Sequence, residues 1–366
     1  MIHMSPHFWE LRDTLEYRCH GGIIVQYAVR LINAPTCPNA TLPRSMPLFV
    51  FFGGMNTSTD GGLSRVTTWL EQAPFYGLST FVFVIPLRPQ GHWWFLDNDS
   101  AFGWVDGKFC ANLVDAFLEW IRYLSSDKCI DPEYVSLLGF SAGAYAVAEL
   151  LARNSAVPIR GVVIGGVHGH GQPDTSDLEP SQTPPDDVLE KWTAFLARLR
   201  GVKQTPSCLI GIHNIYDCMC PWKHAELIYR EMISCLSPHT TIDVRCPFGA
   251  RNHNYFDQTF TSGMMQKLLP GNTTCSHIRE QNKRSMKCHT PGCFFLVHPD
   301  YQFGGFCCRQ CHMIFDSNLD HLRGWQHGPK CLMRLAVSPF DTADFCVPHK
   351  PMTLSSFNGQ LVPAYP

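Results

Sequence analysis

The stretch from Tyr134 to Gly143, which reads YVSLLGFSAG, decides the fold of this chain. Its first half is a short apolar run that ends at Gly139, as is typical of a strand buried on both faces of a sheet. Its second half places Ser141 between two glycines, and a predicted helix then runs from Ala142 to Arg153. A serine in this strand–turn–helix setting is predicted to occupy a sharp turn that holds its hydroxyl above the edge of the sheet.

Similar apolar runs lie on both sides of this stretch. A hairpin is predicted over residues 17–29, and five more strands are predicted at residues 48–52, 80–85, 161–164, 208–212 and 242–244. Helices are predicted between them at residues 109–124, 187–199 and 222–236. Strands that alternate with helices indicate an α/β fold with a mostly parallel central sheet flanked by helices.

Composition divides the chain into unequal parts. The 366 residues are 45% hydrophobic and 16% charged with a net charge of -2, which excludes a wholly disordered chain and argues against a general binder of polyanions. Ten of the 17 cysteines are scattered over residues 1–275, but six lie in the 44 residues from Cys288 to Cys331. We therefore expect a large domain at 1–272, a Cys/His-rich module at 273–337 and a Pro-rich, disordered tail at 338–366.

No segment has the pattern of a signal peptide or a membrane span. Residues 1–20 carry five acidic or basic side chains and no apolar centre. No run in the sequence approaches the roughly 18–20 apolar residues of a spanning helix. The sequence therefore predicts a cytoplasmic protein, and a reducing compartment agrees with its scattered cysteines.

Ser141 is the candidate nucleophile, and a serine nucleophile needs a base and an acid that orients the base. After a turn of this kind the acid and then the base follow in chain order. Asp217 lies on the loop after the strand at 208–212, and His253 lies on the loop after the strand at 242–244. The predicted triad is Ser141, Asp217 and His253. Competing acids and bases by position are Asp243, Asp257, His213, His224 and His239.

Two further groups of residues complete the predicted site. Backbone N–H groups of Ala142 and of Gly54 or Met55 are candidates for an oxyanion hole, although the Gly-Gly pair could be a plain strand-ending turn. Aromatic residues follow the strand at 80–85 and are candidates for an apolar substrate pocket, or for ordinary core packing. They are Trp93, Trp94 and Trp104.

Residues 10–270 resemble an α/β-hydrolase, nearest to the phospholipase/carboxylesterase and dienelactone-hydrolase group. The motifs that carry the resemblance are Phe52-Gly53-Gly54, Ile130 to Val135 leading into Gly139 to Gly143, and His213 to Asp217 with Pro221. Asn214 and Phe52 depart from the group, which usually has glycine and often histidine at these places. The resemblance implies hydrolysis of a small-molecule carboxylic ester, or a related acyl transfer or peptide cleavage, through an acyl-enzyme and without a catalytic cofactor.

The Cys/His-rich module contains two close ligand pairs, Cys308-x2-Cys311 and His327-x3-Cys331, separated by 15 residues. This spacing is compatible with a tetrahedral structural zinc site. Disulfides are the alternative. Further residues that could join or replace these ligands are Cys288, Cys293, Cys307 and His321.

The module has a net charge of +4 over residues 277–334, which is a slight electrostatic attraction for nucleic acid. We therefore expect it to contact a protein partner or to have a structural role, rather than to bind nucleic acid. The alternative to an enzyme is a binding or scaffold protein, in which a hydrolase-like fold is the platform and the module carries the function.

Overall fold

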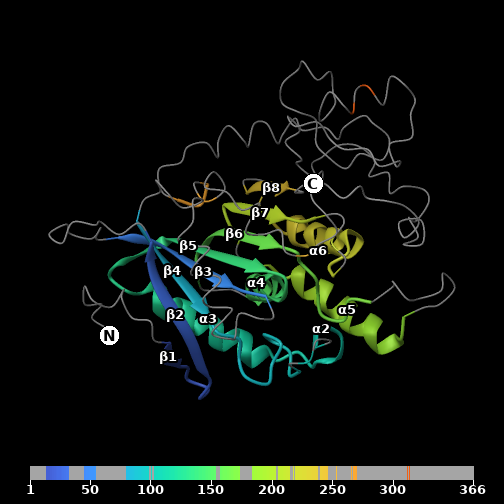
Figure 1. The fold of residues 1–366 in the computed structure, drawn as a ribbon, viewed down its shortest axis with the longest axis horizontal. Helices are drawn as coiled ribbons and strands as arrows, with labels where there is room; N and C mark the ends of the chain where they lie inside the picture. The colour runs from blue at the N-terminus through green and yellow to red at the C-terminus, as the bar shows by residue number, and fades with distance from the viewer. Residues whose placement is uncertain are drawn as a thin grey trace, which may run out of the picture.

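The computed structural model describes residues 14–32, 45–54, 80–98, 100, 103–153, 157–173, 184–202, 205–214, 217, 219–237, 240–245, 253, 265, 267–269, 311 and 313. Within them the chain forms an eight-stranded sheet (Figure 1). Its strands are β1 (Leu15–Arg18), β2 (Ile24–Ile32), β3 (Met46–Phe52), β4 (Phe81–Pro86), β5 (Ile130–Phe140), β6 (Ile159–Gly165), β7 (Cys208–Ile212) and β8 (Thr241–Arg245).

The strand order is β1-β2-β4-β3-β5-β6-β7-β8. β2 is antiparallel to β1 and to β4, whereas all neighbours from β4 to β8 are parallel. The predicted α/β architecture with a mostly parallel sheet is therefore confirmed. All residues of β3, β4 and β7 are buried, which explains why these strands read as unbroken apolar runs.

Five helices are described: α2 (Gly103–Asp106), α3 (Ala111–Ser125), α4 (Ala142–Arg153), α5 (Asp186–Leu199) and α6 (Trp222–Ser234). The last four match the predicted helices to within a few residues. The four-residue α2 was not predicted, because it is too short to show a helical period. Among the described residues, no helix is long and apolar enough to span a membrane.

The two faces of the sheet have separate cores. Leu48, Val50 and Phe52 of β3 belong to a large cluster with apolar residues of α3, α4, α5 and α6. Phe49 and Phe51 alternate with them and face a smaller cluster that includes Met265, Leu268 and Leu269. This alternation is the period of two that a strand imposes on its side chains. The described long helices thus cover one face, and Met265, Leu268 and Leu269 contribute to the cover of the other.

The strand order changes direction at the centre of the sheet. From β3 the chain passes to β4 on one side and then to β5 on the other, so β3 and β5 are neighbours whose connections leave in opposite directions. Such a switch point, at the carboxyl ends of parallel strands, is where open α/β sheets bind ligands. Phe52 pairs with Gly139 at this end, so Gly53-Gly54 and Ser141 follow adjacent strands.

Candidate active site

Ser141 occupies the strained turn that the sequence predicts. Its φ is 55°, in the left-handed region that non-glycine residues seldom adopt. Its N–H donates to the Gly165 carbonyl at 2.8 Å, and its carbonyl accepts the N–H groups of Ala144 at 2.9 Å and Tyr145 at 3.3 Å. The turn is thereby fixed between β6 and the start of α4, where the helix dipole favours negative charge.

Gly139 and Gly143 flank Ser141, and neither position has room for a side chain. A Cβ on Gly143 would lie 1.8 Å from the carbonyl oxygen of Phe52, and a Cβ on Gly139 would lie 2.4 Å from the carbonyl oxygen of Gly143. Neither obstacle can rotate away, because both are backbone atoms. The motif therefore reflects close packing of α4 against β3 and β5.

The glycine loop after β3 lies beside the serine. A Cβ placed on Gly54 would be 3.6 Å from the Cβ of Ser141. Ala142 begins α4 and is buried; the first N–H groups of a helix have no acceptor within the helix. Gly54 thus lies beside Ser141, and Ala142 directly follows it, whereas Met55 lies outside the described residues. The oxyanion hole stays a prediction.

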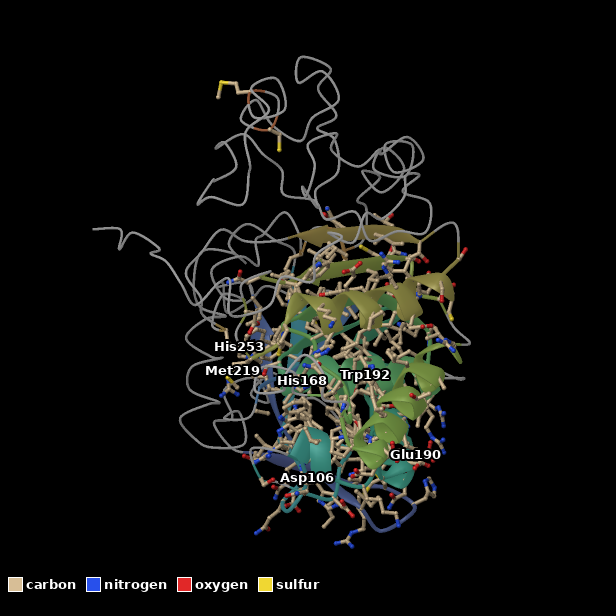
Figure 2. All side chains as sticks on the ribbon, turned by 90° about the vertical axis from the view of Figure 1, so that its right-hand side faces the viewer. Asp106, His168, Glu190, Trp192, Met219 and His253 are labelled. Carbon is tan, nitrogen blue, oxygen red and sulfur yellow. The ribbon has the colours of Figure 1, made fainter. Side chains whose placement is uncertain are left out.

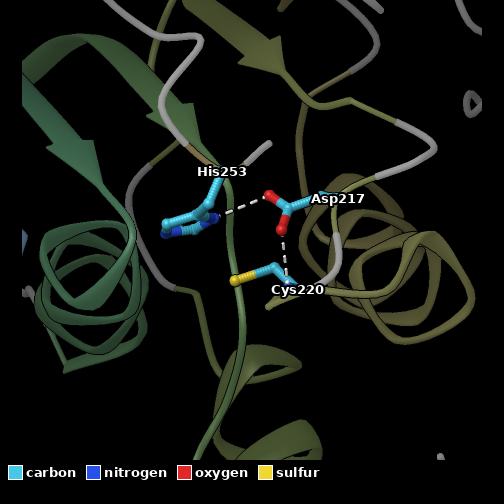
Figure 3. Close-up of side chains that lie close together, drawn as sticks. All are labelled: Asp217, Cys220 and His253. Carbon is cyan, nitrogen blue, oxygen red and sulfur yellow. Dashed lines mark hydrogen bonds and ion pairs between the residues drawn. The ribbon is translucent and has the colours of Figure 1, made fainter. Parts of the chain in front are cut away.

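His253 and Asp217 form a hydrogen-bonded pair (Figure 3). The Nδ1 atom of His253 is 2.8 Å from Oδ2 of Asp217. The other oxygen, Oδ1, accepts the N–H groups of Met219 at 2.8 Å and Cys220 at 2.9 Å. The imidazole stacks on the ring of Phe140, with centroids 5.0 Å apart, and Phe140 directly precedes Ser141. The structure thus brings the predicted base and acid together, next to the turn that carries the predicted nucleophile.

The carboxyl group of Asp217 is kept ionised by its surroundings. Burial by itself raises its pKa, but the hydrogen bond and charge of His253 and the N–H of Cys220 outweigh burial and lower the pKa below its usual value. A carboxylate in this position holds the proton of His253 on Nδ1, so that Nε2 is the nitrogen available to accept a proton.

The competing residues that can be described have other partners. Asp243 on β8 is ion-paired with Lys267. His213 is buried with Nε2 2.8 Å from the Cys220 carbonyl oxygen, and His224 packs edge-on against Trp192. His239 and Asp257, the remaining competitors, lie outside the described residues.

A glycine-rich loop after β6 adds side chains that the sequence reading missed. His168 lies on this loop and is buried between two indoles, with ring centroids 4.8 Å from Trp93 and 5.9 Å from Trp104. Burial and then the charge of His253 lower its pKa to about 3, so it is neutral and close to the pair. Its Nδ1 has no hydrogen-bond partner among the described residues. Figure 2 shows it between His253 and Trp192.

The three tryptophans proposed for a substrate pocket differ in position. Trp93 is buried against His168, and Trp104 is half-buried on its other side. Trp94 packs against Phe52 and its indole N–H donates to the Gly53 carbonyl at 3.2 Å, so it supports the glycine loop from the core. Trp93 and Trp104 are thus the pair that borders the His168 loop.

Little of the Cys/His-rich module can be described. Cys311 is buried and is not in a disulfide. The other predicted ligands lie outside the described residues: Cys288, Cys293, Cys307, Cys308, His327 and Cys331. The boundaries at 272 and 337 and the tail also fall there, so the module and its zinc site stay predictions.

Comparison with known proteins adds distant likenesses. No family model matches the sequence, and no curated protein matches it. Among solved structures, the chain is similar to a thermostable esterase, at 14% identity and a TM-score of 0.47 over 70% of this chain and 62% of the esterase. It is also similar to an acylaminoacyl peptidase of Pyrococcus horikoshii, at 14% identity and a TM-score of 0.42 over 70% of this chain and 39% of the peptidase.

A third similar structure is 2,6-dihydroxy-pseudo-oxynicotine hydrolase, at 11% identity and a TM-score of 0.42 over 73% of this chain and 67% of that one. The chain spans less than two thirds of both the esterase and the peptidase. Similarity at this level assigns no family. The functional argument therefore rests on the geometry of the site.

Proposed function

We propose that this chain is a serine hydrolase that cleaves a carboxylic ester, or a related acyl bond, through Ser141, His253 and Asp217. The observation that carries the proposal is the 2.8 Å contact between His253 Nδ1 and Asp217 Oδ2, made by an imidazole that stacks on Phe140 beside the strained Ser141 turn. A base oriented by an acid, next to a serine at a helix start, is the arrangement that activates a serine hydroxyl.

In the proposed reaction, Ser141 Oγ attacks the carbonyl carbon of the ester while His253 Nε2 takes the hydroxyl proton. Asp217 keeps the other imidazole proton on Nδ1 and stabilises the imidazolium that forms. His253 then gives its proton to the departing alcohol, which leaves an acyl group on Ser141. A water molecule, deprotonated by His253, then attacks the acyl-enzyme, and His253 returns this proton to Ser141 Oγ as the acid leaves.

The negative charge of the tetrahedral intermediate develops on the former carbonyl oxygen. We propose that the N–H of Ala142 and an N–H of the Gly54–Met55 loop donate to it. The N-terminus of α4 adds its dipole at the same place. One donor of this kind typically contributes about 10²–10³ in kcat, which is a sizeable share of the rate enhancement.

The test is hydrolysis of p-nitrophenyl esters of increasing acyl length by the full chain. We expect turnover with an initial burst of p-nitrophenol equal to the enzyme concentration, because an acyl-enzyme accumulates when its hydrolysis is slow. Ser141→Ala is expected to abolish the burst. Ser126→Ala is the matched control, since Ser126 is an exposed residue after α3, and it is expected to behave as wild type.

A folded wild-type protein that hydrolyses none of these esters, and no peptide or thioester either, would contradict the proposal. That result would favour the scaffold alternative, in which the Cys/His-rich module carries the function.

For the module, we propose one structural zinc ion held by Cys308, Cys311, His327 and Cys331. Metal analysis of the purified protein tests it, and disulfides without metal would refute it.

A further inference from the structure

Cys220 places a thiol beside the His253–Asp217 pair. One ligand atom from each of Asp217, Cys220 and His253 lies within 4.8 Å of the other two. The side chains of Cys220 and Asp217 are buried, and that of His253 is 15% exposed. Figure 3 shows the carboxylate of Asp217 beside the imidazole of His253, and the sulfur of Cys220 below the imidazole. Acylation and deacylation make no use of this thiol.

We propose that Asp217, Cys220 and His253 form a binding site for a zinc-class divalent cation, and that the bound ion reversibly inhibits the enzyme. A thiolate, an imidazole and a carboxylate are a donor set that suits zinc and other borderline-soft ions, and does not suit magnesium or calcium. A carboxylate and a thiolate together balance the two positive charges of the ion. Three protein ligands leave a fourth position for water.

The distances require only a small adjustment. In a tetrahedral site with Zn–N and Zn–O near 2.0 Å and Zn–S near 2.3 Å, two ligand atoms are roughly 3.3–3.6 Å apart. The three atoms here, all within 4.8 Å of one another, must therefore approach or separate by roughly 1.5 Å at most. The backbone N–H of Cys220 donates to Asp217 Oδ1 at 2.9 Å, so two of the three proposed ligands are already held next to each other.

The inhibition follows from the tautomer of His253. Nδ1 is the nitrogen that faces Asp217, so an ion that binds both residues takes Nδ1. The single ring proton of the neutral imidazole must then move from Nδ1 to Nε2, because the metal takes the Nδ1 lone pair. Nε2–H is a donor and cannot accept the proton of Ser141. The thiol proton of Cys220 passes to solvent when the thiolate binds.

The binding part of the test does not depend on catalysis. Co²⁺ is titrated into the full chain after removal of bound metal, and the thiolate-to-cobalt absorption band is recorded for wild type and for Cys220→Ala. We expect wild type to bind one more equivalent of Co²⁺ than Cys220→Ala, so that metal bound by the C-terminal module cancels in the difference. Cys220→Ser, which is nearly isosteric, serves if the alanine variant fails to fold.

The inhibition part rests on the proposed hydrolase function. We expect Zn²⁺ to suppress ester hydrolysis by wild type, a chelator to restore it, and Cys220→Ala to weaken the inhibition by about 100-fold. Cys235→Ala is the matched control, because Cys235 follows the far end of α6, about 20 Å along the helix from Cys220, and it is expected to respond as wild type.

Equal cobalt binding and equal Zn²⁺ sensitivity in wild type and Cys220→Ala would overturn the proposal. A cobalt difference in a protein without hydrolytic activity would leave the metal site standing and refute the hydrolase instead. The two proposals therefore fail in different ways.

Discussion

Asp217 divides its two oxygens between two tasks. Oδ1 accepts the N–H groups of Met219 and Cys220, which fixes the carboxylate, and Oδ2 faces Nδ1 of His253. The orientation of the base therefore depends on a charge that the backbone holds in place. An amide at this position would keep the size of the side chain but would not hold the Nδ1–H tautomer reliably.

Asp217→Asn is accordingly expected to lower kcat by about 10³–10⁴ while the protein stays folded. Steady-state kinetics with a p-nitrophenyl ester and circular dichroism measure the two effects. Asp131→Asn is the control. Asp131 is partly exposed and accepts the Glu133 N–H, so its change should alter kcat by less than about twofold. A wild-type kcat in Asp217→Asn would show that another acid orients the base.

Gly143 tests the packing under the nucleophile. Gly143→Ala would push a Cβ against the carbonyl oxygen of Phe52 at 1.8 Å, so we expect a loss of about 3 kcal/mol or more in the free energy of unfolding. Gly21→Ala is the control, because nothing lies within 4 Å of its would-be Cβ. Urea unfolding of both variants gives the comparison, and equal stability would contradict the described turn.

Helices α4 and α5 are joined by a buried ion pair. Arg198 donates to both oxygens of Glu149, with Nη2 to Oε1 at 2.6 Å, and its guanidinium lies 4.0 Å over the ring centroid of Phe109. Glu149 is 1% exposed, so removal of the arginine would leave a carboxylate buried without its counter-charge. The pair contributes to the position of α4, which begins directly after Ser141.

Arg198→Ala is expected to lower the free energy of unfolding by about 3–5 kcal/mol. The matched control is Arg200→Ala, which breaks an ion pair with Glu231. The N–O distance in this pair is also 2.6 Å, but the arginine side chain is 61% exposed. That change should have a much smaller effect, because solvent screens an exposed ion pair. Chemical denaturation distinguishes the two, and similar losses would show that burial does not determine the effect.

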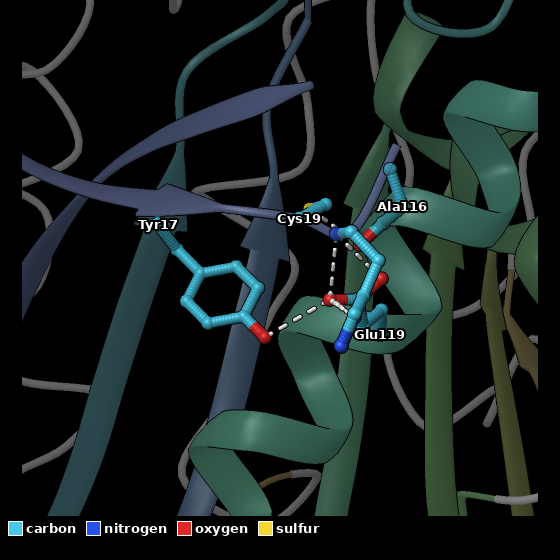
Figure 4. A network of polar contacts seen from close by, with 5 residues as sticks. Tyr17, Cys19, Ala116 and Glu119 are labelled. Carbon is cyan, nitrogen blue, oxygen red and sulfur yellow. Dashed lines mark hydrogen bonds and ion pairs between the residues drawn. The ribbon is translucent and has the colours of Figure 1, made fainter. Parts of the chain in front are cut away.

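The elements themselves could be predicted well, but their tertiary partners could not. The hairpin of β1 and β2 shows in the sequence because its apolar pattern flanks a glycine turn. Its attachment to α3 does not show, since Tyr17 OH and the His20 N–H donate to Glu119, about 100 positions away (Figure 4). The thiol of Cys19 also donates to the Ala116 carbonyl at 3.3 Å. Contacts between residues so far apart have no local signature.

In the candidate site too, residues that follow predicted strands could be identified from the sequence, whereas their tertiary neighbours could not. Ser141, Asp217 and His253 could be proposed because each follows a predicted strand, and parallel strands bring their carboxyl ends to one edge. His168 was missed, although its glycine-rich loop also follows a predicted strand, because neither period nor spacing shows that two indoles will enclose it. Cys220 was missed for the same reason, since the proximity of its thiol to His253 depends on two separate loops.

For the molecule as a whole, buried histidines predict a loss of stability in mild acid. Burial is the main cause that lowers the pKa of His168 to about 3, and of His170 and His213 to about 4. The unfolded chain, with histidine pKa values near 6.5, therefore binds more protons below that pH than the folded chain does. Stability is complete above about pH 6.5 and falls as the pH drops toward 4.

Each of these histidines is expected to cost about 2 kcal/mol at pH 5 relative to pH 7. Glu149 acts in the opposite direction, because burial raises its pKa. Urea unfolding at pH 7 and pH 5 measures the difference, and His213→Gln should make it smaller. A free energy of unfolding that is equal at both pH values would contradict neutral, buried histidines around the site.

In the proposed mechanism, His253 and Asp217 make Ser141 nucleophilic. The most direct test of this mechanism is covalent labelling of the folded full chain by a fluorophosphonate, followed by mass mapping of the modified peptide. We predict one adduct on Ser141, formed at least about 10³-fold more slowly in His253→Ala, since the base would be absent. A folded protein that stays unlabelled, or that carries the adduct on another residue, would contradict it.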